Sequence, residues 1–225
     1  MIRSTIASIL VIFKKDLHSE LRTRYALNAL LMFVITTLSI ILFSIGNESV
    51  SPELLAGILW VIVFFSSMSG LSRTFISEEE KGTVLTLHLL ARPLTIYYGK
   101  LIFNTILLFS FNIFTVALFL IVVPGFTVAN YGIFTITIIL GTLGLASAST
   151  IIAAIIAKAN TKGTLYPVLS FPILLPLLLT LINATKLSVD GAVLADAIGE
   201  FRIMISYMVV LTVISSFLFE YIWKE

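Results

Sequence analysis

Residues 78–83 are three glutamates, a lysine, a glycine and a threonine in succession. Charged and polar side chains of these types can form ion pairs and hydrogen bonds at a protein surface. Carboxylates repel one another and are costly in lipid, so Glu78, Glu79 and Glu80 predict a helix end that stays in water. Gly82 can stop that helix, because glycine tolerates the left-handed conformation common after a helix C-terminus, and Thr83 can cap the next helix. The segment therefore predicts a charged, glycine-hinged elbow that a neighbouring chain can contact.

The segment after this elbow predicts a short helix that is apolar on nearly every side. A helix beginning at Val84 should end at Ala91, because Pro93 disfavours helical conformation in the residue before it. Such a helix needs a cover, which either the membrane interface or a groove on a partner protein could supply. Its apolar positions are Val84, Leu85, Leu87, Leu89 and Leu90.

No motif for bond-making chemistry accompanies the elbow. The sequence contains no G-x-x-x-x-G-K-[ST] phosphate-binding loop, no H-E-x-x-H metal site and no G-x-S-x-G nucleophile turn. It also contains no cysteine, which excludes disulfides, thiolate metal sites and covalent heme attachment through a Cys-x-x-Cys-His box. We expect no metal site, no directly bound cofactor and no enzymatic activity in this chain. The two histidines, His18 and His88, fit surface positions better than a role as heme ligands.

The elbow must be positioned by a membrane-embedded framework. Hydrophobic residues make up 59% of the chain and its mean hydropathy is +1.10, far from the values of a soluble domain. A spanning helix needs about 20 apolar residues, and six stretches without a central Asp, Glu, Lys or Arg meet that requirement. We therefore predict an all-α polytopic membrane protein with a single membrane domain, 1–225. Its six transmembrane helices are expected at about 26–46, 54–72, 101–123, 131–157, 165–183 and 203–222.

Three further elements are predicted outside the spans. Residues 1–25 form an amphipathic interfacial helix, because the apolar side chains fall on one arc while Lys15, His18 and Arg22 lie opposite. The loop at 73–100 joins the second and third spans and carries the elbow and the short apolar helix as a coupling loop. Residues 184–202 predict a short outer-surface helix between the fifth and sixth spans, capped by Ser188.

Charge assigns these elements to the two sides of a membrane. Twelve of the fourteen Lys and Arg residues lie in the N-terminal segment, the 73–100 loop, the loop with Lys158 and Lys162, or at Lys224. The other two are Lys186 and Arg202. By the positive-inside rule, both termini and the 73–100 loop face the cytoplasm. The predicted location is a bacterial inner membrane, and an organellar inner membrane of bacterial descent is equally compatible.

The spans contain polar, small and helix-bending residues. Asn104 and Asn112, with Thr115, predict either hydrogen bonds between helices or a polar translocation path. Gly144 and Ala148 allow another helix, from this chain or a second copy, to approach closely. The fifth span should be kinked, either as a static bend or as a hinge. Its prolines are Pro167, Pro172 and Pro176.

Several of these features together resemble a known family. Glu80-Lys81-Gly82-Thr83, the leucines that follow, and Arg92-Pro93 resemble the cytoplasmic loop of type-2 ABC exporter permeases, although the spacing from Gly82 to Pro93 is longer than usual. The stretches FKKDLHSELRTR, FFSSMSGLSRTFISEEEKGT and YYGKLIFN, with the proline-rich fifth span, are similar to the heme exporter protein B family. That family supplies the membrane subunit of the cytochrome c maturation ABC transporter.

The resemblance implies a site, a cargo and a set of partners. Two copies of the chain would pair with two separate ATPase subunits and with other heme-handling membrane proteins, and no nucleic-acid partner is expected. ATP hydrolysis would drive export of heme, the candidate cargo, or release of a heme-loaded chaperone. The alternatives are a non-transporting scaffold for cytochrome c assembly factors and an ABC-2 type exporter of another amphiphile. The implied ATPase-coupling residues are Glu78, Glu79, Glu80, Lys81, Gly82, Thr83 and Leu87.

Overall fold

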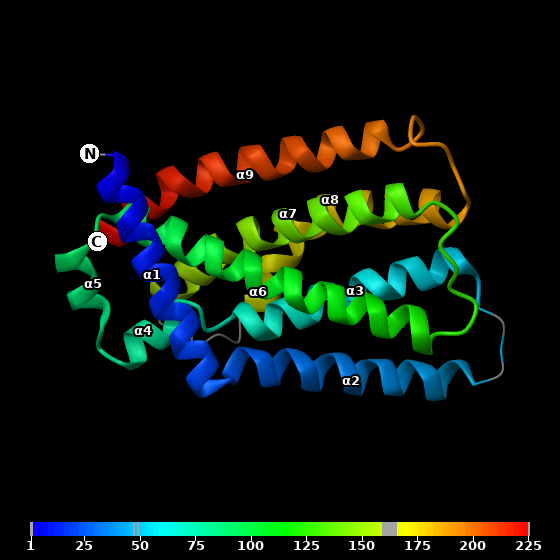
Figure 1. Cartoon of the computed structure of the whole chain (residues 1–225), viewed down its shortest axis with the longest axis horizontal. Helices are drawn as coiled ribbons and strands as arrows, with labels where there is room; N and C mark the ends of the chain where they lie inside the picture. Colours follow the sequence, from blue (N-terminus) through cyan, green and yellow to red (C-terminus); the bar gives the residue numbers. More distant parts are fainter. Residues whose placement is uncertain (1, 47, 49, 159–165, 225) are drawn as a thin grey trace.

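The computed structural model describes residues 2–46, 48, 50–158 and 166–224 and shows an elongated helical bundle (Figure 1). Lys162 and residue 165, the predicted start of the fifth span, lie outside the described residues. Within these ranges the chain forms helices and no strand, so the predicted all-α class is confirmed. The helices are α1 (Ile2–Thr23), α2 (Tyr25–Ile45), α3 (Pro52–Leu71), α4 (Ile76–Glu80), α5 (Val84–Leu90), α6 (Pro93–Val122), α7 (Tyr131–Lys158), α8 (Tyr166–Val189) and α9 (Ile198–Lys224).

Within the described residues, six helices are long and apolar enough to cross a membrane, which agrees with the six predicted spans. They are α2, α3 with its extension into α4, α6, α7, α8 and α9. The largest difference from the predicted boundaries is in α6, which begins at Pro93 rather than at residue 101. Proline is favoured at the first position of a helix because no hydrogen bond is lost there. The end of the 73–100 loop is therefore helical, and Lys100 belongs to α6.

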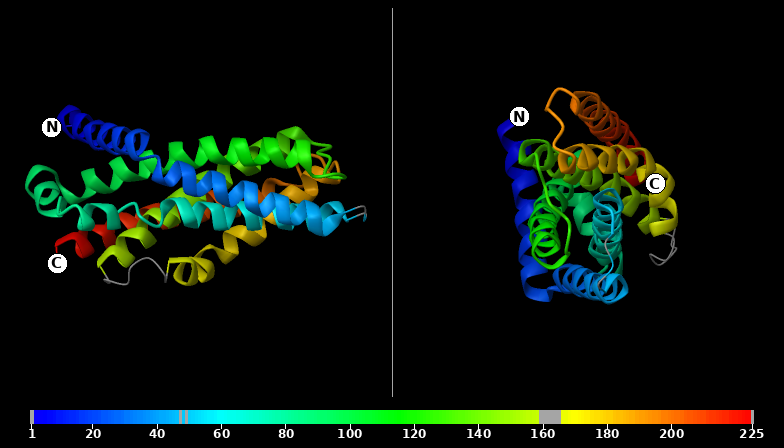
Figure 2. Two further views of the ribbon diagram at one scale, coloured as in Figure 1. Left: turned by 90° about the horizontal axis from the view of Figure 1, so that it is seen from below. Right: turned by 90° about the vertical axis from the view of Figure 1, so that its right-hand side faces the viewer.

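The elements sort to the two ends of the bundle (Figures 1 and 2). The end that carries α1, α4 and α5, with both chain termini, is called the elbow end below. The opposite end, called the loop end, carries the connections 46–51, 123–130 and 190–197. At the elbow end, α5 reaches beyond the ends of the spanning helices in both side views.

Helix α7 forms the centre of the bundle. Its apolar segment is 78% buried, whereas those of α2 and α9 are only 22% and 17% buried and lie at the edges. A side-chain carbon at Gly141 would lie 2.6 Å from the Trp60 ring, and one at Gly144 would lie 2.7 Å from Leu177. Small residues therefore let α3 and α8 approach α7 closely, as predicted, and the partners come from within the chain.

Helix α1 lies across α6 at the elbow end (Figure 1). A side-chain carbon at Gly99 of α6 would lie 2.7 Å from Ile12 of α1, so the two helices touch at this glycine. Ile6 and Leu10, on another face of α1, remain about half exposed. One face of α1 is thus packed on the bundle, and an apolar face is left free, as an interfacial helix requires.

The loop end contains no separate helix between α8 and α9 in the described structure, so the predicted outer-surface helix is wrong. Helix α8 continues to Val189, and residues 190–197 form successive turns. Gly191, with φ of +74°, reverses the chain directly after α8. Ser188 is not a cap: it lies in the last turn of α8 and its hydroxyl donates to the Thr185 carbonyl at 2.6 Å.

Candidate functional site

The segment Ile76–Leu90, which comprises α4, the turn 81–83 and α5, is called the elbow below. Its turn is built on Gly82, whose φ of +65° is in the left-handed region that favours glycine. The Gly82 N–H donates to the Glu79 carbonyl at 3.0 Å, and the Thr83 N–H donates to the Glu78 carbonyl at 3.0 Å. Ala91 is extended and leads into Pro93. The predicted two-helix elbow is therefore present.

Glu78 departs from the sequence prediction. Glu79 and Glu80 are exposed as expected, but Glu78 is only 6% exposed. The reason is that α4 is a short helix separated from α3 by the turns at residues 72–75, and it directs Glu78 between α1 and α6. A carboxylate in such a place must be paired with cations and hydrogen-bond donors, because burial of an unpaired charge is costly.

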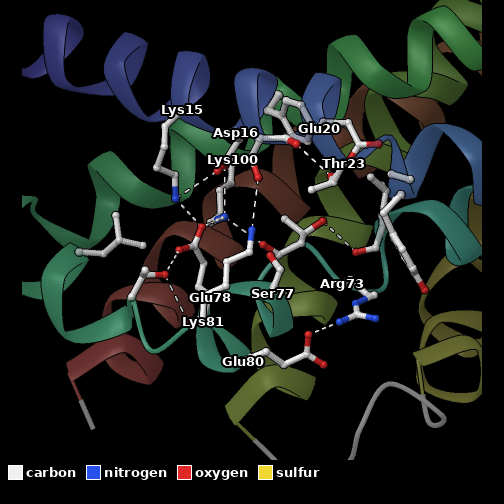
Figure 3. A pocket seen from close by; sticks show the side chains of 18 of the residues that line it. Lys15, Asp16, Glu20, Thr23, Arg73, Ser77, Glu78, Glu80, Lys81 and Lys100 are labelled. Atoms are coloured by element: carbon white, nitrogen blue, oxygen red, sulfur yellow. Dashed lines mark hydrogen bonds and ion pairs between the residues drawn. The ribbon is translucent and has the colours of Figure 1, made fainter.

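Four ionic side chains from three helices meet at this point and form the cluster called the ion cluster below: Lys15, Asp16, Glu78 and Lys100 (Figure 3). The Lys100 Nζ, in a residue 1% exposed, donates to Asp16 Oδ2 at 3.2 Å and to Glu78 Oε1 at 3.2 Å. It also donates to the Thr74 carbonyl at 2.9 Å. Lys15 bonds the same Glu78 carboxylate and lies 3.2 Å from Asp16 Oδ1. Glu78 thereby ties α4 to both α1 and α6.

Lys15 stays charged in this setting. Burial lowers the pKa of its ammonium group, but the adjacent Asp16 and Glu78 carboxylates raise that pKa by more, and the net shift is upward. Lys15 lies on a partly exposed side of α1, as its polar position in the sequence predicts. The sequence did not predict its contacts with Asp16 and Glu78.

Thr83 also has a role other than the predicted one. Its side chain makes no cap bond to the N-terminus of α5. The hydroxyl instead donates to the Glu78 carboxylate, and it lies 3.3 Å from the Glu78 carbonyl oxygen. The Thr83 hydroxyl thus holds the end of α4 at the turn, and it adds a third donor, beside Lys15 and Lys100, to the ion cluster.

Outer contacts connect the elbow to the first two helices and to the end of α3. Glu80 pairs with Arg73, whose guanidinium also lies 4.7 Å from the centre of the Tyr25 ring. Lys81 donates to the Ser19 hydroxyl at 3.3 Å. The Arg73–Glu80 pair is solvent-exposed and contributes on the order of 0–1 kcal/mol. The buried ion cluster is therefore the stronger link between elbow and bundle.

Helix α5 presents an uncovered apolar surface. Leu87 is buried against the bundle, whereas Leu85, Leu89 and Leu90 are 75%, 87% and 78% exposed. His88 stacks on the Trp223 ring of α9, with the ring centres 4.8 Å apart. Within the described residues, nothing covers the other side of α5, so a membrane interface and a groove on a partner protein both stay open as its cover.

The polar residues proposed for a translocation path lie between α6 and α7. The Asn104 amide donates to Thr150 at 2.9 Å, and the Asn112 amide donates to Thr142 at 2.8 Å. Thr115 is also buried, and its hydroxyl has no hydrogen-bond partner among the described residues. These residues therefore join two packed helices in this conformation, and their part in a path stays a prediction.

The three prolines occupy different places in α8. Pro167 lies in the first turn, whereas Pro172 and Pro176 lie inside the helix. Each internal proline removes one backbone donor, and the Thr180 hydroxyl bonds the Pro176 carbonyl at 2.8 Å. The internal pair could bend or yield, and the hinge role likewise stays a prediction.

The ranges 2–46, 50–158 and 166–224 bring together no group of three His, Asp or Glu side chains suited to a metal ion. His18 is exposed on α1, and His88 contacts Trp223 as described above.

The geometry above defines a class: a six-span helical membrane protein with an amphipathic first helix and an ion-anchored elbow at the same end. Residues 7–222 match the CcmB protein family, and the chain belongs to that family. No curated protein matched the chain. Membership confirms the resemblance to heme exporter protein B and implies a permease subunit of a heme exporter for cytochrome c maturation, which acts with an ATPase subunit.

Proposed function

We propose that this chain receives ATP-driven motion from a separate ATPase at the elbow and passes it to the spanning helices. One observation carries the proposal: Glu78 of the elbow is bonded by Lys15 of α1 and by Lys100 of α6. Movement of α5 shifts Glu78, and the two lysines must follow or the buried charges lose their partners. Because lost pairing of a buried charge is costly, the elbow and the bundle move together.

In this proposal, the exposed leucines of α5 dock into a groove on the ATPase. The chain itself carries no phosphate-binding loop, which supports a separate partner that binds and hydrolyses ATP. Two copies of the chain pair with two ATPase subunits, alongside other heme-handling membrane proteins. The elbow end and both termini face the cytoplasm of a bacterial inner membrane, because twelve of the fourteen basic residues are assigned to that side.

The transported or released species is heme or a heme-loaded chaperone. Asn104, Asn112 and Thr115 lie where α6 and α7 separate if the bundle opens, and the prolines of α8 supply a helix that yields. Opening has to replace the Asn104–Thr150 and Asn112–Thr142 hydrogen bonds with bonds to water or cargo. Polar residues paired in the closed state would thus become a polar path in the open state.

Gly82 offers a test of the elbow that leaves the spans intact. We expect Gly82→Pro to reduce ATP-dependent cytochrome c maturation at least about tenfold, because proline fixes φ near −65° and removes the N–H that bonds Glu79. Membrane insertion and unfolding of the spanning helices should change little, since Gly82 lies in the turn between α4 and α5, outside those helices. Cytochrome c yield and detergent-solubilised melting curves are the measurements.

Gly82→Ala provides the graded control. It keeps the N–H and costs only about 1–2 kcal/mol for a left-handed alanine, so partial function is expected. Full cytochrome c maturation with Gly82→Pro, at normal protein levels, would rule out the elbow as the coupling element.

A further inference from the structure

A cavity of about 520 Å³ lies beside the ion cluster, beneath α1 and the elbow (Figure 3). Both surface elements and spanning helices line it, because its lining residues come from α1, α2, α3, α4, α5 and α6. Cavities of this size hold small organic groups. The proposed coupling function does not require it to be occupied.

The cavity is polar at one end and apolar at the other. The polar lining comes mostly from α1 and the elbow, with Ser19, Ser77 and Lys81 among its members. The apolar lining includes Phe103 and Leu107 of α6. Leu107 is seven positions beyond Lys100 in the same helix, or about 10 Å farther along the span at 1.5 Å per residue. The cavity therefore runs from the membrane surface toward the bilayer interior.

Two ionic groups of the cavity lining, Lys81 and Glu20, have no oppositely charged partner among the described residues. Asp16 and Glu78 are held by Lys15 and Lys100, and Glu80 is held by Arg73. The Glu20 carboxylate accepts from the Leu27 N–H at 2.9 Å, where α1 meets α2. Lys81 has no carboxylate within ion-pair distance among the described residues, and its Nζ contacts only the Ser19 hydroxyl there. An anionic group entering the polar end would meet this lysine.

We propose that the cavity binds one anionic phospholipid, with its headgroup phosphate at Lys81 and an acyl chain against Phe103 and Leu107. A lipid suits the site better than a soluble phosphate, because the far end of the cavity is apolar and lies along a spanning helix. The free apolar face of α1, at Ile6 and Leu10, places the polar end at the level of lipid headgroups. The bound lipid joins the elbow to α1, and so tunes how stiffly the elbow is held.

The test uses the full-length chain, delipidated in detergent, and counts bound lipids by native mass spectrometry. Phosphatidylglycerol is expected to be retained as one tight adduct, and phosphatidylcholine more weakly. Lys81→Gln should weaken phosphatidylglycerol retention about fivefold, as loss of one cation near an anionic headgroup predicts. Lys14→Gln is the matched control, because Lys14 is exposed on α1 and does not line the cavity; it should leave retention unchanged.

A second variant tests the apolar end. Leu107→Trp fills the space for the acyl chain and should also reduce retention, so each variant alone can decide the result. Glycerol-1-phosphate, the free headgroup, should not compete at concentrations that saturate with lipid. Equal retention by the wild type and both variants, equal binding of phosphatidylcholine, or full competition by glycerol-1-phosphate would each overturn the proposal. The lipid measurement needs no ATPase. The lipid proposal can therefore be contradicted while the proposed coupling function still holds.

Discussion

Replacing Lys100 by methionine is expected to lower the free energy of unfolding by about 3–5 kcal/mol, the largest stability effect at the elbow end. The reason is that Lys100 is the buried cation between Asp16 and Glu78, and its loss leaves two buried carboxylates with only the partly exposed Lys15 as a cation. Thermal or denaturant unfolding of the detergent-solubilised chain measures the change. Lys14→Met removes an exposed lysine of α1 and should change the unfolding free energy by less than about 0.5 kcal/mol.

A further variant at Lys100 tests the stability of the chain and its coupling to ATP hydrolysis separately. A triple variant, Lys100→Met with Asp16→Asn and Glu78→Gln, removes the buried charges together and should recover most of the lost stability. It should nevertheless fail to restore ATP-driven cytochrome c maturation, because the elbow no longer has an ionic link to α1 and α6. Wild-type unfolding of Lys100→Met would show that the ion cluster does not form.

Replacing Leu89 by glutamate is expected to weaken association with the ATPase by about 30-fold or more. Leu89 is 87% exposed at the tip of the elbow, so the isolated chain should unfold as the wild type does. An apolar anchor buried at the centre of an interface contributes about 2 kcal/mol or more, which corresponds to this loss of affinity. Affinity between the purified chain and its ATPase subunit, measured in detergent or nanodiscs, is the readout.

Val193→Glu is the control for this prediction. Val193 is 66% exposed at the loop end, and the same change of charge there should leave ATPase affinity unchanged. Equal affinities for wild type and Leu89→Glu would mean that the leucines of α5 face lipid or another protein instead.

The sequence predicted the spans well because their signal is local. A run of about 20 apolar residues marks a helix in lipid wherever its partners lie, and proline and glycine mark the ends. The elbow was predicted for the same reason, since Gly82 and Pro93 act on their immediate neighbours. The outer-surface helix failed because α8 continues to Val189, and Gly191, which marks its end, lies inside the segment that was assigned to the separate helix.

The ion cluster could not be predicted in this way. Lys100 and Asp16 are 84 residues apart, and only the crossing of α1 over α6 brings them together. Gly99 gave a partial signal, since a glycine beside a lysine can mark a close helix approach, but it does not name the partner. Glu78 looked like its two neighbours in the sequence, and only the fold distinguishes the buried carboxylate from the exposed ones.

The most direct test of the docking claim uses single cysteines, since the chain has none of its own. Leu89→Cys and Val193→Cys are prepared as separate variants, and each is treated with a short bifunctional cross-linker in membranes that also contain the ATPase subunit. We predict that the cysteine at position 89 cross-links to the ATPase and that the one at position 193 does not. Cross-linking from position 193 instead, or none from position 89 when the two proteins co-purify, would contradict the account.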